Sequence, residues 1–291
     1  MTPKVSIIIP VYNTAALLPR CLESVVAQTL REVEIICVND GSTDNSLEVL
    51  NLWAERDSRI KVLSQENGRQ GKARNLAMSI AEGEFVGMID SDDYIPSDYF
   101  ERLYTAACEA NADIAVCGII KEKKVSNRVV VMYNQTEVAE TISDKLRICN
   151  CPPDFHPVNK LYRRAMLERL GLRFEEGVAF EDVMFVSRAL CESGRLVTTP
   201  NVAYRYVLNP TSTVKSRQTA QKQQQKYNAH RAMVNYMQSK GVTLSSRHSN
   251  ITVRHYSIGG VCLWKIKESG NRRTIRLFDA IPVWCSKRNN K

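Results

Sequence analysis

The sequence lacks any apolar run long enough to cross a bilayer. A membrane-spanning helix needs about 18 or more predominantly apolar residues in succession, and the 291 residues contain no such run. The chain also lacks the basic and apolar opening of a secretory signal peptide, because strand-like sequence begins at once with Lys4–Ile9. We therefore expect a cytoplasmic protein.

The cysteines provide neither a disulfide framework nor a zinc site. Nine is an odd number, and these residues are spread through apolar segments, as expected of free, buried thiols in a reducing compartment. Cys149 and Cys151 lie near His156, but their spacing is not the C-x₂-C of zinc sites and no second pair follows. We expect no metal at this place.

The glycine-rich turn of dinucleotide-binding folds is also missing. Pro10-Val11-Tyr12-Asn13 follows the first predicted strand, which argues against a nicotinamide or flavin cofactor. A sugar-nucleotide nucleotidyltransferase stays open as an alternative, although the glycine- and basic-rich loop usual at this position is absent. A non-catalytic protein that binds nucleic acid or another anionic surface is the third hypothesis. No RNP-like motif, zinc pattern or helix-turn-helix supports a nucleic-acid partner.

Acidic residues are scarce in the C-terminal part of the chain. Residues 215–291 contain 16 Lys and Arg but only two acids, whereas residues 1–214 contain 24 basic and 29 acidic residues. We expect residues 215–291 to form a basic helical region, with helices near 218–240 and 247–268. Such a region suits an anionic surface such as membrane lipid.

Residues 1–214 alternate apolar strand patterns with helical ones. This alternation predicts an α/β fold with a Rossmann-like, mixed but mostly parallel sheet. We expect a nucleotide-binding half at about 1–95 and an acceptor half at about 96–214. The predicted strands are 5–11, 33–38, 60–63, 85–89, 113–118 and 204–207, with a peripheral hairpin at 119–135; the predicted helices include 98–111, 138–149, 163–170 and 181–193.

Polar residues follow each of the first four predicted strands. In open α/β sheets, ligands bind at the carboxyl ends of the strands, so these residues are expected to line one crevice. The last group, Asp90-Ser91-Asp92-Asp93, has more carboxylates than helix capping requires, and Mg²⁺ or Mn²⁺ is bound by one or two carboxylates together with phosphates. The other groups are Tyr12-Asn13, Asp40 and the loop Gly68–Arg74. Glu181-Asp182, at a helix start, could add a general base.

Taken together, Val5–Asn13, Asn39–Asp44, Asn67–Asn75, Asp90–Asp93 and Glu181-Asp182 resemble the family 2 glycosyltransferases. These are bacterial enzymes of the GT-A fold that include polysaccharide and lipopolysaccharide types. The resemblance implies metal-dependent, inverting transfer of a sugar from a nucleotide diphosphate, usually UDP. The acceptor would be a hydroxyl of a glycan or a lipid-linked glycan.

The resemblance also implies roles for single residues. Asp182 would be the catalytic base, Asp40 would bind the nucleotide base, and Asp92 the ribose. Asp93 would hold the metal together with Asp92, with Asp90 as a further member of the cluster. The nucleotide-binding residues implied are Pro10, Val11, Tyr12, Asn13, Asp40, Gly68, Arg74, Asp90, Ser91 and Asp92.

Two further segments carry weaker likenesses. His156, Lys160 and Arg164 resemble a segment of capsule- and lipopolysaccharide-type members, where Lys160 or Arg164 would contact phosphate; with Glu181 they are the acceptor-side candidates. Tyr204-Arg205-Tyr206 resembles a segment near the end of the catalytic domain. Because such acceptors are often membrane-linked, we expect peripheral attachment of the basic region to the cytoplasmic face of the inner membrane.

Overall fold

A computed structural model describes residues 2–122, 127–208 and 219–242, and, between residues 251 and 287, the backbone of four strands. The chain divides into two compact units, Met1–Tyr236 and Met237–Lys291. No helix in the described part of the chain combines the length and the apolar character that crossing a membrane requires. The division into nucleotide and acceptor halves stays a prediction.

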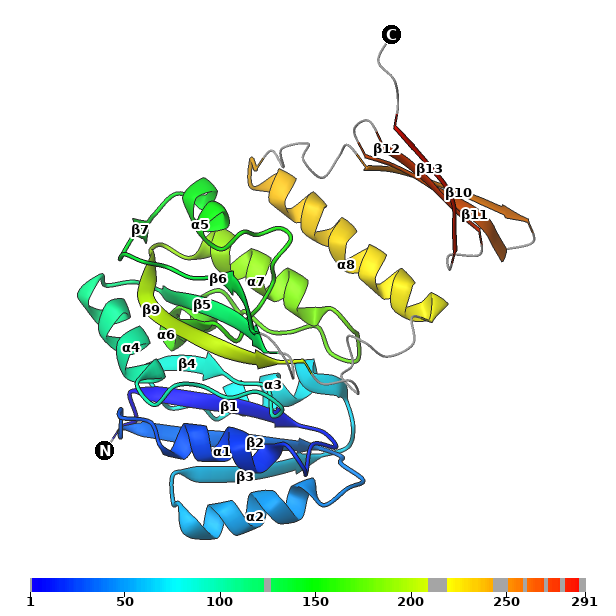
Figure 1. Ribbon diagram of the computed structural model, residues 1–291. Coiled ribbons are helices and arrows are strands. Elements are labelled where there is room, and N and C mark those ends of the chain that lie inside the picture. Colours follow the sequence, from blue (N-terminus) through cyan, green and yellow to red (C-terminus); the bar gives the residue numbers. More distant parts are fainter. Residues whose placement is uncertain are drawn as a thin grey trace. The chain divides into compact units, whose positions relative to one another are not determined.

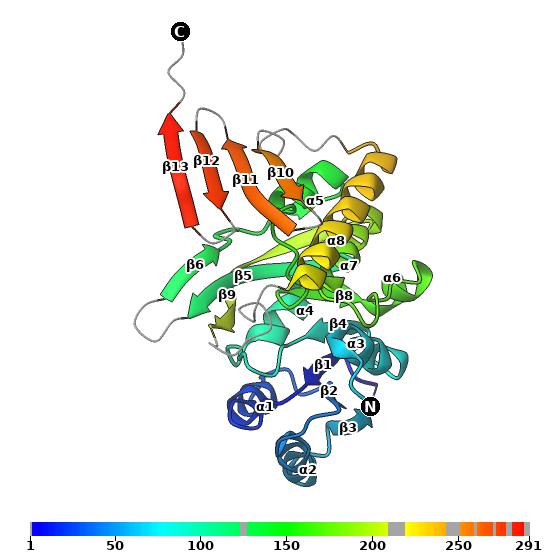
Figure 2. The ribbon, with the colours of Figure 1, turned by 90° about the vertical axis from the view of Figure 1, so that its right-hand side faces the viewer.

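The first part of the larger unit is a parallel sheet covered by helices on both faces. Strand β1 is buried along its whole length, because helices α1 and α2 pack on one side of this sheet and α3 on the other (Figures 1 and 2). The strand order β3-β2-β1-β4 places β1 at the centre. The elements are β1 (Val5–Val11), α1 (Leu18–Val26), β2 (Val33–Asp40), α2 (Ser46–Arg56), β3 (Ile60–Gln65), α3 (Arg69–Ser79) and β4 (Phe85–Met88).

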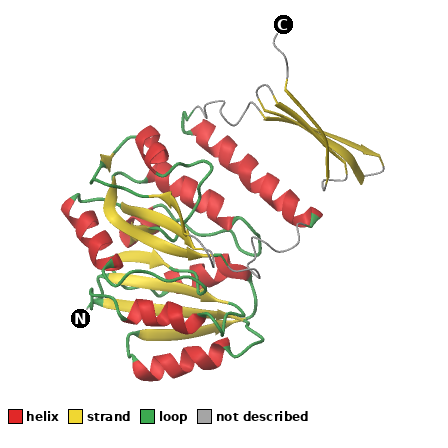
Figure 3. Cartoon of the chain, viewed as in Figure 1, coloured by secondary structure: helices red, strands yellow, loops and turns green. Residues whose placement is uncertain are grey.

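The second part extends the same sheet and makes it mixed. The order continues β4-β8-β5-β9-β7, and β6 pairs with β5; β8 runs antiparallel to both neighbours, whereas β5 and β9 are parallel. The predicted α/β class with a mostly parallel sheet is confirmed (Figure 3). The elements are α4 (Tyr99–Glu109), β5 (Ile114–Glu122), β6 (Asn127–Val131), β7 (Val138–Ala139), α5 (Ile142–Ile148), β8 (Lys160–Arg163), α6 (Arg164–Arg169), α7 (Glu181–Glu192) and β9 (Leu196–Val207).

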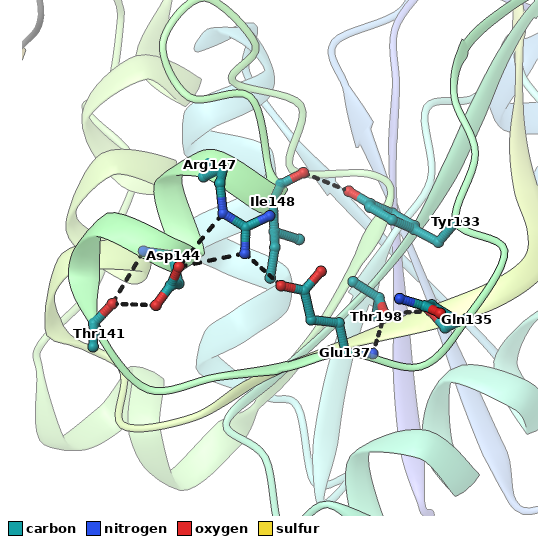
Figure 4. A network of polar contacts seen from close by, with 8 residues as sticks. All are labelled: Tyr133, Gln135, Glu137, Thr141, Asp144, Arg147, Ile148 and Thr198. Atoms are coloured by element: carbon teal, nitrogen blue, oxygen red, sulfur yellow. Dashed lines mark hydrogen bonds and ion pairs between the residues drawn. The ribbon is translucent and has the colours of Figure 1, made fainter.

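Side-chain bonds fasten the segment between β6 and α5 to the sheet (Figure 4). Thr198 on β9 donates its hydroxyl to the carbonyl of Gln135 at 2.9 Å and accepts the amide of Glu137 at 2.7 Å. Glu137 also pairs with Arg147 on α5. Thr141 caps α5 by accepting the amide of Asp144, as a threonine N-cap does. The segment is therefore held along its length.

The C-terminal region is only partly helical. Helix α8 (Ala220–Ser239) confirms the first predicted helix. The second, near 247–268, is wrong, because β10 (Ile251–Ile258) and β11 (Val261–Ser269) are strands there. With β12 (Arg272–Leu277) and β13 (Ile281–Lys287) they form an antiparallel sheet. The β-branched run Ile251-Thr252-Val253 and the alternation of apolar with charged residues at 264–267 favour strands, since both patterns fit a pleated sheet.

Candidate nucleotide and catalytic site

The polar strand ends that the sequence singled out lie on one edge of the sheet. The parallel registers pair Val11 with Asn39 and Asp40 with Gln65, and Ile8 of β1 pairs with Met88, two residues before Asp90. The polar residues therefore follow the strands at a common edge, where open α/β sheets bind ligands.

Asn13 and Thr14 tie three of these strand ends together. The side-chain oxygen of Asn13 accepts the amide of Thr43 at 2.7 Å, and the amide of Asn13 donates to the Ser42 hydroxyl at 3.1 Å. The hydroxyl of Thr14 donates to that of Ser91 at 3.0 Å. Asn13 has a positive φ of 51°, which asparagine tolerates better than most residues. The predicted residues Asn13 and Ser91 thus hold the crevice in shape.

Asp40 organises the loop that begins α3. Its buried carboxylate accepts the amide of Gly68 at 2.8 Å and the side-chain amide of Gln65 at 2.7 Å through one oxygen, Oδ1. Tyr12 is 49% exposed, so part of its side chain is accessible to a ligand. Pro10 and Val11 are part of the buried strand β1.

Arg74 is the buried cation of the site. Its side chain is 2% exposed and forms ion pairs with Asp90 at 2.8 Å and with Glu181 at 2.9 Å. Its guanidinium lies 5.2 Å from the ring centroid of Phe174, and its Nε has no hydrogen-bond partner among the described residues. Arg74 therefore links the start of α7 to the turn Asp90–Asp93 that follows β4, which we call the acidic turn. The predicted acceptor-side residue Glu181 is buried in this ion pair.

The three acids after β4 have different surroundings. Asp93 is 1% exposed, and its two oxygens accept the Tyr204 hydroxyl at 2.8 Å and the Val207 amide at 2.7 Å. Burial, then Asp90 and Asp92, raise the pKa of Asp93 well above its usual value. With both oxygens engaged in the interior, this geometry favours a role for Asp93 in fixing the turn, and its metal role stays a prediction. Asp90 and Asp92 are both partly exposed.

No group of three or more His, Cys, Asp or Glu residues in the described ranges has the arrangement of a metal cage. Mg²⁺ and Mn²⁺ at phosphate-transfer sites do not require one, because one or two carboxylates and the substrate's phosphates complete the coordination. The turn residues Asp90 and Asp92 fit that requirement, and Asp93 fits the role of fixing the turn on β9.

Asp182 has the electrostatics of a general base. It follows Glu181 in the first turn of α7, after Phe180 with a left-handed φ of 68°. Burial raises the pKa of Asp182 to about 7, with a further rise from Glu181 and an opposing effect from Arg74. A carboxylate with a pKa near neutrality is suited to take a proton at physiological pH.

His156 and Lys160 lie close to each other, whereas Arg164 is elsewhere. The amine of Lys160 donates to the carbonyl of His156 at 2.7 Å. Arg164 donates to the carbonyl of Gly83 at 2.7 Å and to Glu168 at 2.6 Å. Gly83 precedes β4, so Arg164 lies at the opposite end of that strand from Asp90, and its phosphate contact stays a prediction that this position does not favour.

The sequence did not predict that Tyr204 holds the turn Asp90–Asp93 in place. This buried tyrosine accepts the amide of Asp90 at 3.0 Å and donates to Asp93, so one side chain of β9 fixes both ends of the acidic turn. The resemblance noted for Tyr204–Tyr206 was a signal for the segment, but the partner of its hydroxyl lies 111 positions away. Helical or strand periodicity carries no information about such a contact.

A mixed α/β sheet with acids, a buried arginine and a candidate base at the carboxyl edge is the GT-A arrangement. The model of the family "Glycosyl transferase family 2" matches residues 6–171. The protein named "Uncharacterized glycosyltransferase EpsJ" of Bacillus subtilis is 36% identical over 73% of this chain and 63% of its own length. The chain therefore belongs to glycosyl transferase family 2.

Solved structures share the fold. The crystal structure of S. aureus TarS 1–349 in complex with UDP-GlcNAc superposes with a TM-score of 0.71 at 26% identity, over 85% of this chain and 69% of that one. A mannosyltransferase of Pyrobaculum calidifontis, PcManGT, in complex with GDP-Man and Mn²⁺, has a TM-score of 0.60 at 20% identity, over 81% and 65%. The chain spans about three fifths of the length of the curated relatives EpsJ and EpsH.

Proposed function

We propose that this protein is an inverting, metal-dependent glycosyltransferase. It transfers a sugar from a nucleotide diphosphate, a UDP-sugar, to a hydroxyl of a glycan or lipid-linked glycan in cell-surface polysaccharide synthesis. The observation that carries the proposal is Asp182, a half-buried acid with a pKa of about 7 whose charge acts on Arg74. Arg74 is itself paired with the acidic turn. These contacts of Arg74 support a site in which the proposed base lies near the proposed nucleotide-binding edge.

In the proposed reaction, Asp182 takes the proton of the acceptor hydroxyl as its oxygen bonds to the anomeric carbon. The bond from that carbon to the diphosphate breaks at the same time, and UDP leaves with the electron pair. One displacement of this kind inverts the configuration at the carbon. Burial of Asp182 favours it as a base because the raised pKa strengthens its affinity for the proton.

The donor is proposed to lie along the strand ends. The exposed ring of Tyr12 offers a stacking face for the base, and Asp40 with Gly68 shapes the neighbouring loop. TarS was solved with UDP-GlcNAc and PcManGT with GDP-Man, which supports a nucleotide-sugar donor for this fold. We keep UDP as the nucleotide that the family resemblance implies.

We propose that Asp92, with Asp90 beside it, holds Mn²⁺ or Mg²⁺. The ion, when bound, supplies positive charge that stabilises the leaving diphosphate. PcManGT was solved with Mn²⁺, which supports a divalent cation in this fold. Asp93 is proposed to act indirectly, by fixing the turn through Tyr204 and the Val207 amide.

UDP binding with and without Mn²⁺ tests this proposal. Titration calorimetry is expected to show that Mn²⁺ strengthens UDP binding to the wild type by about 10-fold or more, since even a hydrogen bond to a charged group is worth about 1.5–3 kcal/mol. Asp92→Asn should lose the Mn²⁺ dependence. Asp93→Asn should keep most of it, because asparagine still accepts a bond from Tyr204. Metal-independent binding by the wild type would contradict the metal site, and loss in Asp93→Asn alone would return the metal to Asp93.

The basic C-terminal region is proposed to bind the anionic surface on which a lipid-linked acceptor resides. The full chain is expected to co-sediment with vesicles containing phosphatidylserine and not with neutral ones, because residues 215–291 have a strong excess of Lys and Arg. Binding should weaken as salt is raised, since surface charges are screened within about 10 Å at 0.1 M. Equal sedimentation with neutral vesicles would refute the electrostatic attachment.

A further inference from the structure

A small cavity lies between β5, β6 and the loop that precedes β8. Its volume is ≈ 120 Å³, and its polar lining residues are Tyr133, Asn150, Asp154, His156, Asn159 and Lys160. Since a water molecule occupies about 30 Å³ of liquid volume, the cavity has room for a few waters or for one small oxyanion. The bond of the Tyr133 hydroxyl to the Ile148 carbonyl, at 2.9 Å, helps to fix its wall (Figure 4).

Lys160 is buried at this cavity without a counterion. It is 3% exposed, and its amine donates to the His156 carbonyl at 2.7 Å and to the Asn159 side-chain oxygen at 2.8 Å. An ammonium has three N–H donors, so one is left over, and no carboxylate of the described residues lies within 4.0 Å of the amine. A buried charge surrounded by neutral acceptors favours an anionic ligand.

Lys145 is a buried lysine of the same unit whose three N–H donors all have acceptors. It is 1% exposed, and its amine donates to the carbonyl and the hydroxyl of Ser193 and to the carbonyl of Gly194. These acceptors follow the C-terminal end of α7, and together they match all three N–H donors. Burial alone therefore does not distinguish Lys160; its unused donor at a cavity does.

A second lysine adds to the positive potential at the cavity. The amine of Lys121 lies 5.3 Å from the ring centroid of Tyr206, and the Tyr206 ring lies 6.2 Å from that of His156. Burial, then Lys160 and Lys121, lower the pKa of His156 to about 4, so the ring is neutral at physiological pH. Asp154, the acid among the lining residues, is half-buried, and its carboxylate accepts the side-chain amide of Asn150 at 2.7 Å.

Tyr206 connects this cavity to the catalytic acids. Burial raises the pKa of Tyr206, and Asp90, Asp93, Asp92 and Asp182 raise it further. Tyr206 directly precedes Val207, whose amide donates to Asp93 at 2.7 Å, so the backbone beside this tyrosine contacts the turn after β4 while its ring approaches His156. A substrate lying across Tyr206 would bring one of its groups to the cavity and another to Asp182.

We propose that this cavity is a subsite for a phosphate group of the acceptor, held by Lys160, with Lys121 adding positive charge nearby. The assignment rests on the proposed glycosyl transfer, in which the donor's diphosphate is neutralised by the metal at Asp92. The subsite would therefore recognise an acceptor that carries phosphate near the reacting hydroxyl. Neutral glycans would lack this contact.

Phosphate binding by the full chain tests the subsite. Wild-type protein, saturated with UDP and Mn²⁺ so that the donor site is filled, is titrated with inorganic phosphate against chloride at equal ionic strength, and Tm is followed. Phosphate should raise Tm because a ligand of the folded state stabilises it. In Lys160→Met, the phosphate concentration that gives half of the maximal rise in Tm should be higher by about 10-fold or more. The UDP affinity of this variant should stay within about twofold of the wild type.

Lys145→Met is the matched control, because it also removes a buried lysine and lowers Tm but leaves the cavity intact. It should keep the wild-type response to phosphate. Lys121→Ala, at a less buried position, should weaken the response by a few-fold without loss of folding. An unchanged response in Lys160→Met would overturn the subsite, and a loss of UDP affinity in that variant would assign Lys160 to the donor. Failure of the wild type to hydrolyse any UDP-sugar would instead refute the proposed function.

Discussion

Replacing Asp182 by asparagine is expected to reduce sugar transfer by about 10²-fold or more while UDP binding stays near that of the wild type. General acid–base groups contribute about 10²–10⁴-fold to rates, and asparagine keeps the shape of the side chain without its basicity. The donor is proposed to contact the strand ends rather than Asp182, so its affinity should not change. Initial rates with a UDP-sugar, and calorimetric titration of UDP, measure the two quantities separately.

The pH profile gives this prediction a second readout. Since Asp182 must be ionised to accept a proton and its pKa is about 7, the wild-type kcat should rise with pH through about 7 and level off above it. Asp182→Asn should lose that rise. Asp98→Asn is a suitable control, because Asp98 also stands at a helix start but on the surface, beside Arg102. Wild-type turnover in Asp182→Asn would show that another group takes the proton.

The same raised pKa makes Asp182 unfavourable for stability at alkaline pH. In the folded state its pKa is about 7, against a reference of 3.8, so the folded state binds its proton more tightly than the unfolded state. The resulting stabilisation is fully present below about pH 4 and is lost as pH rises through 7. Asp182→Asn should therefore unfold at a higher temperature than the wild type at pH 8, and this advantage should shrink toward pH 5.

Local signals in the sequence were sufficient to predict which edge of the sheet forms the candidate site. An apolar strand followed by polar residues predicts both the strand and the edge at which those residues emerge, because parallel strands share the direction of their ends. Asp40 and Asp90 were located in this way, and the parallel registers confirm their common edge. The strand β8, with four residues, is too short for a periodic pattern to predict it.

The different roles proposed for the acids of this turn could not be predicted from their spacing in the sequence. Asp92 and Asp93 are adjacent, yet Asp93 is enclosed by Tyr204 and Val207, which are contributed by a strand that pairs far from β4 in the sheet. The same holds for Arg74, whose partner Glu181 lies 107 positions away. Neighbouring carboxylates are told apart only by what the rest of the chain packs against them, and that requires the tertiary structure.

Arg74→Met is expected to have the largest effect on stability, lowering the free energy of unfolding by about 3–5 kcal/mol. The substitution leaves Glu181, whose side chain is 1% exposed, without its cation, and removing one partner of a buried pair leaves an uncompensated charge. It should also raise the pKa of Asp182 further, since Arg74 lowers it. The exposure of the buried thiols of Cys21 and Cys37 in increasing urea reports the unfolding of this unit.

The double variant Arg74→Met/Glu181→Gln distinguishes two causes of the stability loss in Arg74→Met: the unpaired charge of Glu181 and the lost packing of the arginine side chain. Glutamine needs no counterion, so the double variant should recover a large part of the loss seen in Arg74→Met, although the contact with Phe174 is still missing. Glu181→Gln alone should cost less than Arg74→Met, because Asp90 still pairs with the guanidinium. A double variant no more stable than Arg74→Met would mean that the guanidinium stabilises the fold by packing rather than by neutralising Glu181. Full recovery would mean that Arg74 stabilises the fold mainly by neutralising Glu181, so that the link between the turn after β4 and α7 is electrostatic.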